Sequence, residues 1–440
     1  MIDPLSFQNR KVAFHTLGCK LNFSETSDMA RRLAAVGFER VDFDDVADVY
    51  VINTCTVTEE ANKKCRQMIG RCIRLNADAF VVVTGCFAQL QADNILKMPG
   101  VGLVLGGNQK GQIAEEVVRG LANRDEKRVV SGDILRDRSF VGGYSSGDRT
   151  RSFLKVQDGC DYFCSYCTIP MARGLSRSAT VAETVDLARQ AAADGAREIV
   201  LTGVNIGDFG RRQGETFLQL VEALESVEGV SRYRISSIEP NLLTTEIIKH
   251  CATPGSKFMP HFHIPLQSGS DDMLRLMRRR YDTALYAEKI ALIKSLIPHC
   301  FIGADVIVGV NGETDELFEQ TRQFIEGVDI SQLHVFTYSE RPGTRALDIK
   351  PVVPIPERHR RNAVLHEISE RKRTAFYKAH ADFETSVLVE STVRDGLHVG
   401  FTENYIRVEV PASADEVNTV VPVRLGTISI DGLTMSSRRL

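Results

Sequence analysis

Short apolar runs alternate with longer amphipathic stretches along the first third of the chain. The runs are rich in valine, isoleucine and leucine, which is typical of strands buried on both faces of a parallel sheet. We expect these strands at Lys11–Leu17, Val49–Asn53, Ala79–Thr84 and Val101–Leu105. The stretches between them have helical spacing and cover Ser24–Val36, Thr58–Leu75 and Gln89–Lys97. This alternation predicts a doubly wound parallel-sheet α/β domain over residues 1–135.

The alternation resumes with a longer period over residues 146–376. The strands are expected at Phe153–Gln157, Glu198–Gly203, Tyr233–Ile238, His261–Leu266, Phe301–Val310 and Gln332–Tyr338. The helices between them are expected at Val181–Asp194, Thr216–Ser226, Thr245–His250, Asp271–Met277, Thr283–Leu296 and Thr314–Gly327. Six β/α units predict a partial (β/α)6 barrel, short of the full eight.

The pattern changes once more after a long basic helix at Glu357–His380. Short β-rich runs separated by turns such as Asp395-Gly396 continue to the last residues. They are expected at Ser386–Thr392, His398–Phe401, Tyr405–Pro411, Val420–Leu425 and Thr427–Ile430. Five such strands predict a small closed or partly closed β-barrel over residues 378–440.

Composition and charge indicate the class of protein, its location and its possible partners. The 440 residues are 43% apolar and 25% charged, which is ordinary for a globular chain of several domains. With no signal peptide and no apolar run of membrane-spanning length, a cytoplasmic location is expected, where thiols stay reduced. The net charge of −3 argues against a general nucleic-acid binder, although residues 341–373 hold nine Lys/Arg against four acids and Arg278–Arg280 adds a second basic block. Either block is as consistent with a solvated helix face as with an RNA partner.

The most specific chemical feature is a group of three cysteines, Cys160, Cys164 and Cys167. Thiols this close in a reducing compartment favour metal ligation over disulfide formation. Three thiolates on a four-iron cluster leave one iron open to a small molecule. A zinc knuckle would need a fourth nearby cysteine or histidine, and chance grouping is the other alternative.

A second set of cysteines follows the expected strands of the first domain. Cys19, Cys55 and Cys86 each come directly after a strand, and the carboxyl ends of parallel strands meet at one edge of the sheet. Burial as inert core thiols would not explain why all three cysteines share this position. The pattern therefore predicts a second metal site. Cys65 and Cys72 share a helix face and are expected to pack in the core, whereas Cys251 and Cys300 are expected to be core or surface thiols.

The spacing of Cys160, Cys164 and Cys167 resembles radical S-adenosylmethionine (SAM) enzymes. The flanking runs Val156–Gly159 and Thr168–Gly174 resemble the methylthiotransferases in particular. The resemblance implies a 4Fe–4S cluster whose open iron chelates SAM for cleavage to a 5′-deoxyadenosyl radical. Residues at SAM are then expected directly before the last cysteine and at the strand ends, namely Tyr166, Asn205, Ser236, Glu239 and Gln267. The loop Gly309–Glu313 departs from the family's usual aromatic-proline pair, which puts its local shape in doubt.

The same resemblance extends to both ends of the chain. The motifs around Cys19, Cys55 and Cys86 look like those of the family's N-terminal domain, which implies an auxiliary 4Fe–4S cluster whose open iron carries the transferred sulfur. The run Gly400–Val408 looks like a TRAM domain, an RNA-binding module, although residues 381–440 hold only five Lys/Arg against nine acids. A TRAM-like barrel here is therefore expected to bind RNA through a local face that includes Phe401 or Tyr405.

Within the family the motifs at Cys19 and Cys160 look most like the MtaB type. That type uses two SAM to convert N6-threonylcarbamoyladenosine, beside the tRNA anticodon, to its 2-methylthio derivative. The alternatives are the MiaB type, which acts on isopentenyladenosine, the RimO type, which acts on a ribosomal-protein aspartate, and a non-enzymatic iron–sulfur carrier or RNA-binding scaffold.

The implied partners are the anticodon stem-loop and a reductant such as flavodoxin or ferredoxin. The threonylcarbamoyl group is anionic, so Arg173 and Arg341 are candidate donors to it, with surface arginines the equal alternative. His261 and His263 are expected to be structural.

Overall fold

The computed structural model describes residues 7–56, 58–147 and 149–440, which fold as two compact units. Unit 1 holds the chain up to Ser145 together with Phe153–Phe163 and Cys167–Ala179. Unit 2 holds Ser146–Ser152, Cys164–Tyr166 and Thr180–Leu440. None of the helices in the described ranges is both long and apolar enough to cross a membrane.

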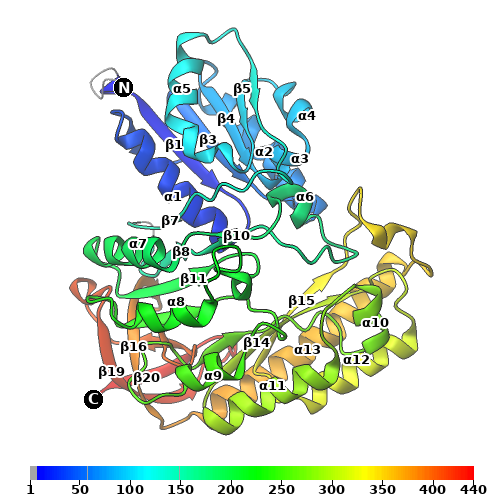
Figure 1. Cartoon of the computed structure of the whole chain (residues 1–440). Helices are drawn as coiled ribbons and strands as arrows, with labels where there is room; N and C mark the ends of the chain where they lie inside the picture. Colours follow the sequence, from blue (N-terminus) through cyan, green and yellow to red (C-terminus); the bar gives the residue numbers. More distant parts are fainter. Residues whose placement is uncertain (1–6, 57, 148) are drawn as a thin grey trace. The chain divides into compact units, whose positions relative to one another are not determined.

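A six-stranded parallel sheet forms the centre of unit 1 (Figure 1). Its order is β2-β1-β3-β4-β5-β6. The bounds are Lys11–Thr16 for β1, Glu39–Val41 for β2, Val49–Thr54 for β3, Phe80–Gly85 for β4, Val101–Leu105 for β5 and Arg128–Val130 for β6. The four expected strands are confirmed. The edge strands β2 and β6 were not expected, because three half-exposed residues make no apolar run.

Helices cover both faces of this sheet, and the strand residues alternate between the two layers. Val49 and Val51 of β3 pack with α1 (Lys20–Ala34) and α5 (Ile113–Ala122). Tyr50 and Ile52 pack on the opposite side with α2 (Glu59–Leu75), α3 (Cys86–Leu90) and α4 (Ala92–Leu96). This sandwich is the doubly wound fold that the sequence predicted. The expected helix Gln89–Lys97 is two shorter helices, because Gln91 leaves the helical conformation.

The remainder of unit 1 comes from the segment that carries the three-cysteine loop. Two short antiparallel pairs form here, β7 (Gly143–Tyr144) with β8 (Ser152–Lys155) and β9 (Gln157–Asp158) with β10 (Arg177–Ser178). Helix α6 (Ile169–Arg173) lies between β9 and β10 in sequence and contacts α3. Unit 1 therefore contains residues of the expected second domain as well as the first.

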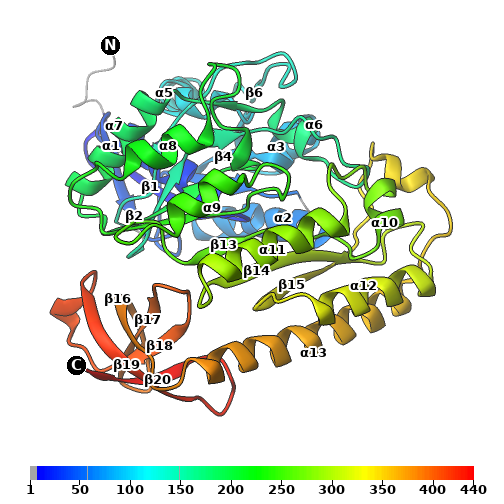
Figure 2. The same cartoon turned by 60° about the horizontal axis from the view of Figure 1, so that its bottom comes forward.

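Unit 2 contains the repeated strand–helix units of the expected partial barrel (Figure 2). Parallel strands β11 (Glu198–Thr202) and β12 (Arg232–Ile235) pair, as do β13 (His261–His263), β14 (Phe301–Val308) and β15 (Gln332–Thr337). A single parallel bridge from Ser237 to His263 continues the series between β12 and β13. The helices are α7 (Val181–Ala193), α8 (Phe217–Leu224), α9 (Thr245–Cys251), α10 (Asp271–Leu276), α11 (Thr283–Leu296) and α12 (Asp315–Gly327). Capping boxes at Thr180 and Thr216 fix the starts of α7 and α8.

A long helix, α13 (Ile355–Ala379), leads to a closed five-stranded barrel. Its strands are β16 (Glu384–Arg394), β17 (Leu397–Thr402), β18 (Arg407–Val410), β19 (Val420–Ile428) and β20 (Met435–Arg439). The sequence pattern was wrong about the last two, because Val420–Ile428 is one strand and Met435–Arg439 is the fifth. Gly426 suggested a turn, but a β-bulge between Leu425 and Ile428 accommodates it within the strand.

Buried arginines of β12 fasten the small barrel to the rest of unit 2. Arg234 pairs with Glu198 at 2.7 Å and donates to the carbonyls of Thr402 and Glu403 at 2.7 and 2.9 Å. The ring of Tyr405 stacks on His261 at 4.1 Å and on Phe401 at 4.7 Å. Both Tyr405 and Phe401 are half-buried, so an RNA-binding face that includes either ring stays a prediction.

Candidate functional site

The three cysteines that follow strands of unit 1 lie at the carboxyl edge of the sheet, and two of them flank its topological switch point. In the order 2-1-3-4-5 the chain turns to opposite sides after β1 and β3, and ligands bind outside the carboxyl ends of those strands. Cys19 caps the start of α1 directly after β1, Cys55 follows β3, and Cys86 is the first residue of α3 after β4. Cys19 is exposed, whereas Cys55 and Cys86 are buried.

Two glycines let the loops that carry these cysteines pack directly against one another. A Cβ on Gly18 would lie 2.8 Å from the Cβ and 3.0 Å from the Sγ of Cys55. A Cβ on Gly85 would lie 2.4 Å from the carbonyl oxygen of Thr54. Both glycines also have positive φ, 102° and 97°, which side-chain-bearing residues rarely adopt. The loops of Cys19 and Cys86 thus both contact the loop of Cys55.

Two asparagines hold the loops in this arrangement. Asn22 donates to the carbonyls of Leu17 and Thr54 at 2.6 and 3.1 Å. Asn53 donates to the carbonyl of Asn22 at 2.9 Å. The asparagine three residues after Cys19 therefore ties the end of β1 to the end of β3.

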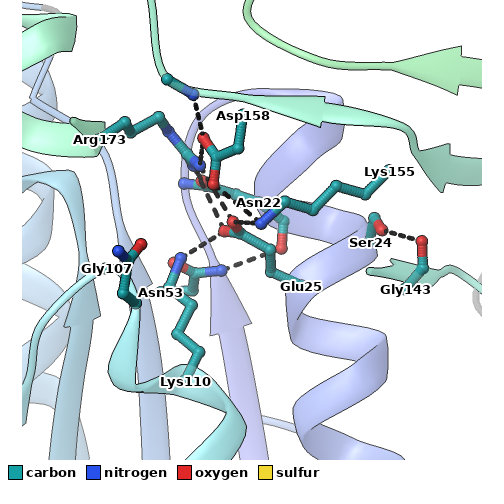
Figure 3. A network of polar contacts seen from close by, with 12 residues as sticks. Asn22, Ser24, Glu25, Asn53, Gly107, Lys110, Gly143, Lys155, Asp158 and Arg173 are labelled. Atoms are coloured by element: carbon teal, nitrogen blue, oxygen red, sulfur yellow. Dashed lines mark hydrogen bonds and ion pairs between the residues drawn. The ribbon is translucent and has the colours of Figure 1, made fainter. Parts of the chain in front are cut away.

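A buried ionic network lies beside these loops (Figure 3). Its centre is Glu25 of α1, which no sequence motif pointed to. Glu25 accepts hydrogen bonds from Lys155 at 2.9 Å and Arg173 at 3.0 Å, and it forms a closer pair with Lys110. Arg173 also binds Asp158 at 3.0 Å and the side chain of Asn22. The network therefore connects directly to the asparagine that holds the cysteine loops.

The charged groups of this network shift the pKa values of their neighbours. Burial alone raises the pKa of Glu25, but Arg173, Lys110 and Lys155 hold it well below its usual range. Burial raises the pKa of the Cys86 thiol, and Arg173 and Lys110 oppose that rise. Arg173 is therefore a buried member of this network that pairs with two carboxylates, and its expected role as a donor to the substrate stays a prediction. Arg341 is likewise buried, at 6% exposure.

Each sulfur of the three-cysteine loop accepts a hydrogen bond. The backbone N–H groups of Tyr162 and Ile169 donate to the sulfurs of Cys160 and Cys167 at 3.5 and 3.4 Å. The sulfur of Cys164 accepts from a guanidinium N–H of Arg279 at 3.1 Å. Such hydrogen bonds stabilise thiolates and set the potential of iron–sulfur clusters. The donor set therefore fits cysteines that carry negative charge.

Arg279 was not expected to be part of the site, because the sequence shows it only as the middle of a basic block. Its side chain is 4% exposed and forms an ion pair with Glu239. It also donates to the hydroxyl of Tyr166 at 3.4 Å. Within unit 2 one guanidinium therefore joins Cys164 to Tyr166 and Glu239, both of which the family resemblance had placed near SAM. Burial raises the pKa of the Glu239 carboxyl, and Arg279 opposes that rise.

Two of the other residues expected at SAM carry buried polar atoms without a protein partner among the described residues. These atoms are the hydroxyl of Ser236 and the side-chain oxygen of Gln267. Gln267 also has a φ of 64°, a strained value for this residue type. Because a buried polar atom without a partner costs free energy, both atoms point to a ligand. Asn205 is buried and donates to Asp208 at 3.1 Å.

The two histidines that were expected to be structural, and the loop Gly309–Glu313, contact other residues of the protein. His261 stacks on Tyr405, and His263 pairs with Asp305 at 2.9 Å. In the loop Gly309–Glu313, the carboxylate of Glu313 accepts from the Gly309 N–H at 2.6 Å and from Arg361 at 2.7 Å. This buried carboxylate gives the loop a defined shape without the family's aromatic-proline pair.

Comparison with known proteins identifies the chain. The model of Uncharacterized protein family UPF0004 matches residues 11–106, and that of the Radical SAM superfamily matches residues 154–325. Threonylcarbamoyladenosine tRNA methylthiotransferase MtaB of Bacillus subtilis (strain 168) is 38% identical over 426 residues, which cover 94% of this chain and 93% of that protein. The chain belongs to the radical SAM methylthiotransferases. It is therefore an enzyme, which removes the non-enzymatic carrier and scaffold alternatives.

Two further similarities bear on fold and substrate. The tRNA-2-methylthio-N(6)-dimethylallyladenosine synthase of Cereibacter sphaeroides is 33% identical, over 94% of this chain and 96% of that protein. The structure of the radical SAM methyltransferase TsrM from Kitasatospora setae, with cobalamin and a 4Fe–4S cluster bound, has a TM-score of 0.55 and covers 77% of each chain at 15% identity. This second similarity supports the fold of the methylthiotransferase alone.

The remaining cysteines of the methylthiotransferase pack as ordinary core residues. Cys65 and Cys72 are fully buried on α2, as expected, and burial raises their pKa values to about 11 and about 12. Cys251 and Cys300 are also buried. In the described part of the chain no three His, Cys, Asp or Glu side chains are grouped to hold a single metal ion. Ligands that belong to different irons of one cluster need no such tight grouping.

Proposed function

We propose that this methylthiotransferase converts N6-threonylcarbamoyladenosine in tRNA to its 2-methylthio derivative, with two SAM and two 4Fe–4S clusters. The observation that carries the proposal is the 38% identity to a relative of that name over nearly the whole of both chains. The cysteine geometry supports the chemistry, because one set of three thiols has sulfur hydrogen bonds and the other lies on loops that contact one another at the carboxyl edge of the sheet.

The first cluster would be held by Cys160, Cys164 and Cys167. When bound, it supplies an electron that cleaves SAM to a 5′-deoxyadenosyl radical. The hydrogen bond from Arg279 to Cys164 stabilises negative charge on that ligand. Arg279 also holds Glu239 by an ion pair and Tyr166 by a hydrogen bond.

The partnerless atoms of Ser236 and Gln267 would bind polar groups of SAM. Tyr166, whose ring packs against the apolar cluster around Met273 and Met277, would lie at the adenine. Asn205 and Glu239 would complete the contacts to the ribose and to the amino-acid end. These assignments combine the family resemblance with the burial of each polar atom.

The second cluster would be held by Cys19, Cys55 and Cys86 and would donate the sulfur. Support comes from Gly18 and Gly85, which allow close contact between the three loops, and from Asn22 and Asn53, which hold them. The exposed Cys19 gives this site access to solvent.

The substrate assignment is tested by mass spectrometry of nucleosides from tRNA of a strain that lacks this gene. The methylthio form of threonylcarbamoyladenosine should disappear and return when the wild-type gene is supplied, but not when the gene encodes Cys55→Ala. If methylthio-isopentenyladenosine disappears instead, the MiaB-type function replaces the proposed one. If both nucleosides persist, a RimO-type protein substrate becomes the next candidate.

We propose the partners and the location of the reaction from the family resemblance. We expect the anticodon stem-loop as the RNA partner, a flavodoxin or ferredoxin as reductant, and a cytoplasmic location. We also propose that the chain has three domains, at residues 1–135, 146–376 and 378–440, and that the last, the TRAM-like barrel, binds RNA.

A further inference from the structure

The buried ionic network of unit 1 contains more positive than negative charge. Its two carboxylates, Glu25 and Asp158, are surrounded by four cations, and every one of these side chains is at most 6% exposed. The cations are Lys110, Lys155, Arg173 and Arg177. Asp137, nearer the surface, interacts with Arg177. Each cation contacts an acid, but among the described residues of the network four cations share three acids even with Asp137 counted, which leaves a surplus of one positive charge.

A surplus of buried positive charge is costly, and an additional anionic group placed against it lowers that cost. The free energy of moving a charge out of water is recovered only through a close opposite charge or strong hydrogen bonds. Within the described part of unit 1 the acids of this network are already shared among several cations. Glu25 alone accepts from three of them.

Three of the four cations, besides their ion pairs, line a cleft beside the loop of Cys86. Lys110, Arg173 and Arg177 line a small cleft together with one acid, Asp158, and with Gly85 and Cys86. The cleft wall thus combines two features, positive charge and a thiol that follows the β4 strand. Burial lowers the pKa of Lys110, whereas Glu25 and Cys86 act to raise it.

We propose that Lys110 and Arg173 form a cationic wall that holds an anionic sulfur ligand, a hydrosulfide or a methanethiolate, on the open iron of the cluster at Cys19, Cys55 and Cys86. This proposal rests on the proposed function, because it requires that cluster to exist. Each thiolate ligand and each anionic sulfur adds negative charge at the cleft. The surplus positive charge of the ionic network offsets this negative charge. The residues act on the sulfur ligand by charge and hydrogen bonding, and they position it.

The chain supplies a matched control for the test. Lys110 and Lys155 both pair with Glu25, and their side chains are equally exposed, at 6%. Lys110 lines the cleft at Cys86, whereas Lys155 does not line it and contacts it only through the lining residue Asp158, at 2.9 Å. Substitution of either lysine by methionine removes one buried charge from the same carboxylate. Only the Lys110 substitution removes it from the wall of the cleft.

The experiment uses the full chain with Cys160, Cys164 and Cys167 replaced by alanine, so that one cluster remains. Lys110→Met, Lys155→Met and Lys110→Arg are made in this parent, reconstituted without oxygen and titrated with sodium methanethiolate. Electron paramagnetic resonance of the reduced cluster reports ligand binding, and a redox titration gives its midpoint potential. Lys110→Met should weaken methanethiolate binding about tenfold or more, as expected for loss of a hydrogen bond from a charged group, and shift the midpoint to a more negative potential.

Lys155→Met should bind methanethiolate much as the parent does, and Lys110→Arg should restore most of the affinity. If Lys110→Met does not hold the cluster, Lys110→Gln, which keeps a donor to Glu25 but removes the charge, is measured in its place and should show the same loss. Equal affinity and potential in the Lys110 and Lys155 variants would overturn the cationic wall while leaving the cluster in place. A parent that binds no iron would overturn the second cluster itself, which is a failure of the proposed function and is distinguishable from the first outcome.

Discussion

The role of single residues in this enzyme depends on burial more than on residue type. Arg278, Arg279 and Arg280 form one basic block in the sequence, which fits RNA binding or a solvated surface equally well. In the structure only Arg279 turns inward, where it bonds to Cys164, Tyr166 and Glu239. Its neighbour Arg280 is exposed. A residue that contacts both a proposed cluster ligand and two proposed cofactor contacts would act through them, as a positioning residue.

Arg279→Met should therefore impair SAM cleavage without loss of the fold. Loss of a group that supports metal ligands typically costs 10–100-fold in metal affinity or activity, and we expect 5′-deoxyadenosine formation after reduction to fall by about that factor. The midpoint potential of the barrel cluster should also become more negative, since a positive donor to Cys164 is lost. Arg280→Met is the control and should leave both quantities unchanged. An Arg279→Met enzyme with the parent's potential would show that the bond to Cys164 has no influence on the cluster.

At the scale of elements, the site depends on how closely the loops at the ends of β1, β3 and β4 can approach. Gly85 has no room for a side chain, because a Cβ would lie 2.4 Å from the Thr54 carbonyl oxygen. Gly195 has a similar φ, 95° against 97°, but no heavy atom lies within 4 Å of its Cβ position. Both positions share a positive φ, but only Gly85 is crowded by a neighbouring cysteine loop. Comparison of substitutions at the two glycines therefore distinguishes the effect of backbone strain from the effect of crowding.

Gly85→Ala should displace the loop of Cys86 from that of Cys55 and prevent assembly of the auxiliary cluster. We expect reconstituted Gly85→Ala to lose about half of the iron bound by the parent, which is about eight atoms for two 4Fe–4S clusters. Gly195→Ala should cost about 1–3 kcal/mol of stability through its strained φ but retain all of the iron. Iron analysis and thermal unfolding measure the two effects. Full iron content in Gly85→Ala would mean that the loops tolerate separation or that no cluster forms there.

The sequence predicted these elements well where a pattern repeats over several residues. The four apolar strands of the first domain and helix Thr283–Leu296 were found nearly as the structure has them. The three-residue edge strands and the bulged β19 were not, because short or glycine-interrupted strands leave little periodicity. The network around Glu25 was missed for a different reason. Lys110, Lys155 and Arg173 are far apart in the sequence, and each alone looks like a surface cation.

At the scale of the whole molecule, the two cysteine sets are expected to divide the reaction into separable halves. Within unit 2, Cys164 accepts a hydrogen bond from Arg279, and the same unit holds the partnerless atoms of Ser236 and Gln267, which suit SAM binding. The set of Cys19, Cys55 and Cys86 is accompanied by the cationic network around Glu25, which suits an anionic sulfur. Each set has its own polar surroundings, so removal of one set should leave the other functional.

Alanine at Cys160, Cys164 and Cys167 should therefore abolish 5′-deoxyadenosine formation and leave about half of the iron. Alanine at Cys19, Cys55 and Cys86 should also leave about half of the iron, but SAM should still be cleaved on reduction and no methylthio group should reach tRNA. Alanine at Cys65 and Cys72 controls for the loss of buried thiols and should retain all of the iron, since both pack in the core. Chromatography of SAM products, iron analysis and nucleoside mass spectrometry on the same three proteins decide the matter. Normal methylthiolation without Cys19, Cys55 and Cys86 would contradict the division, because the sulfur would then have another source.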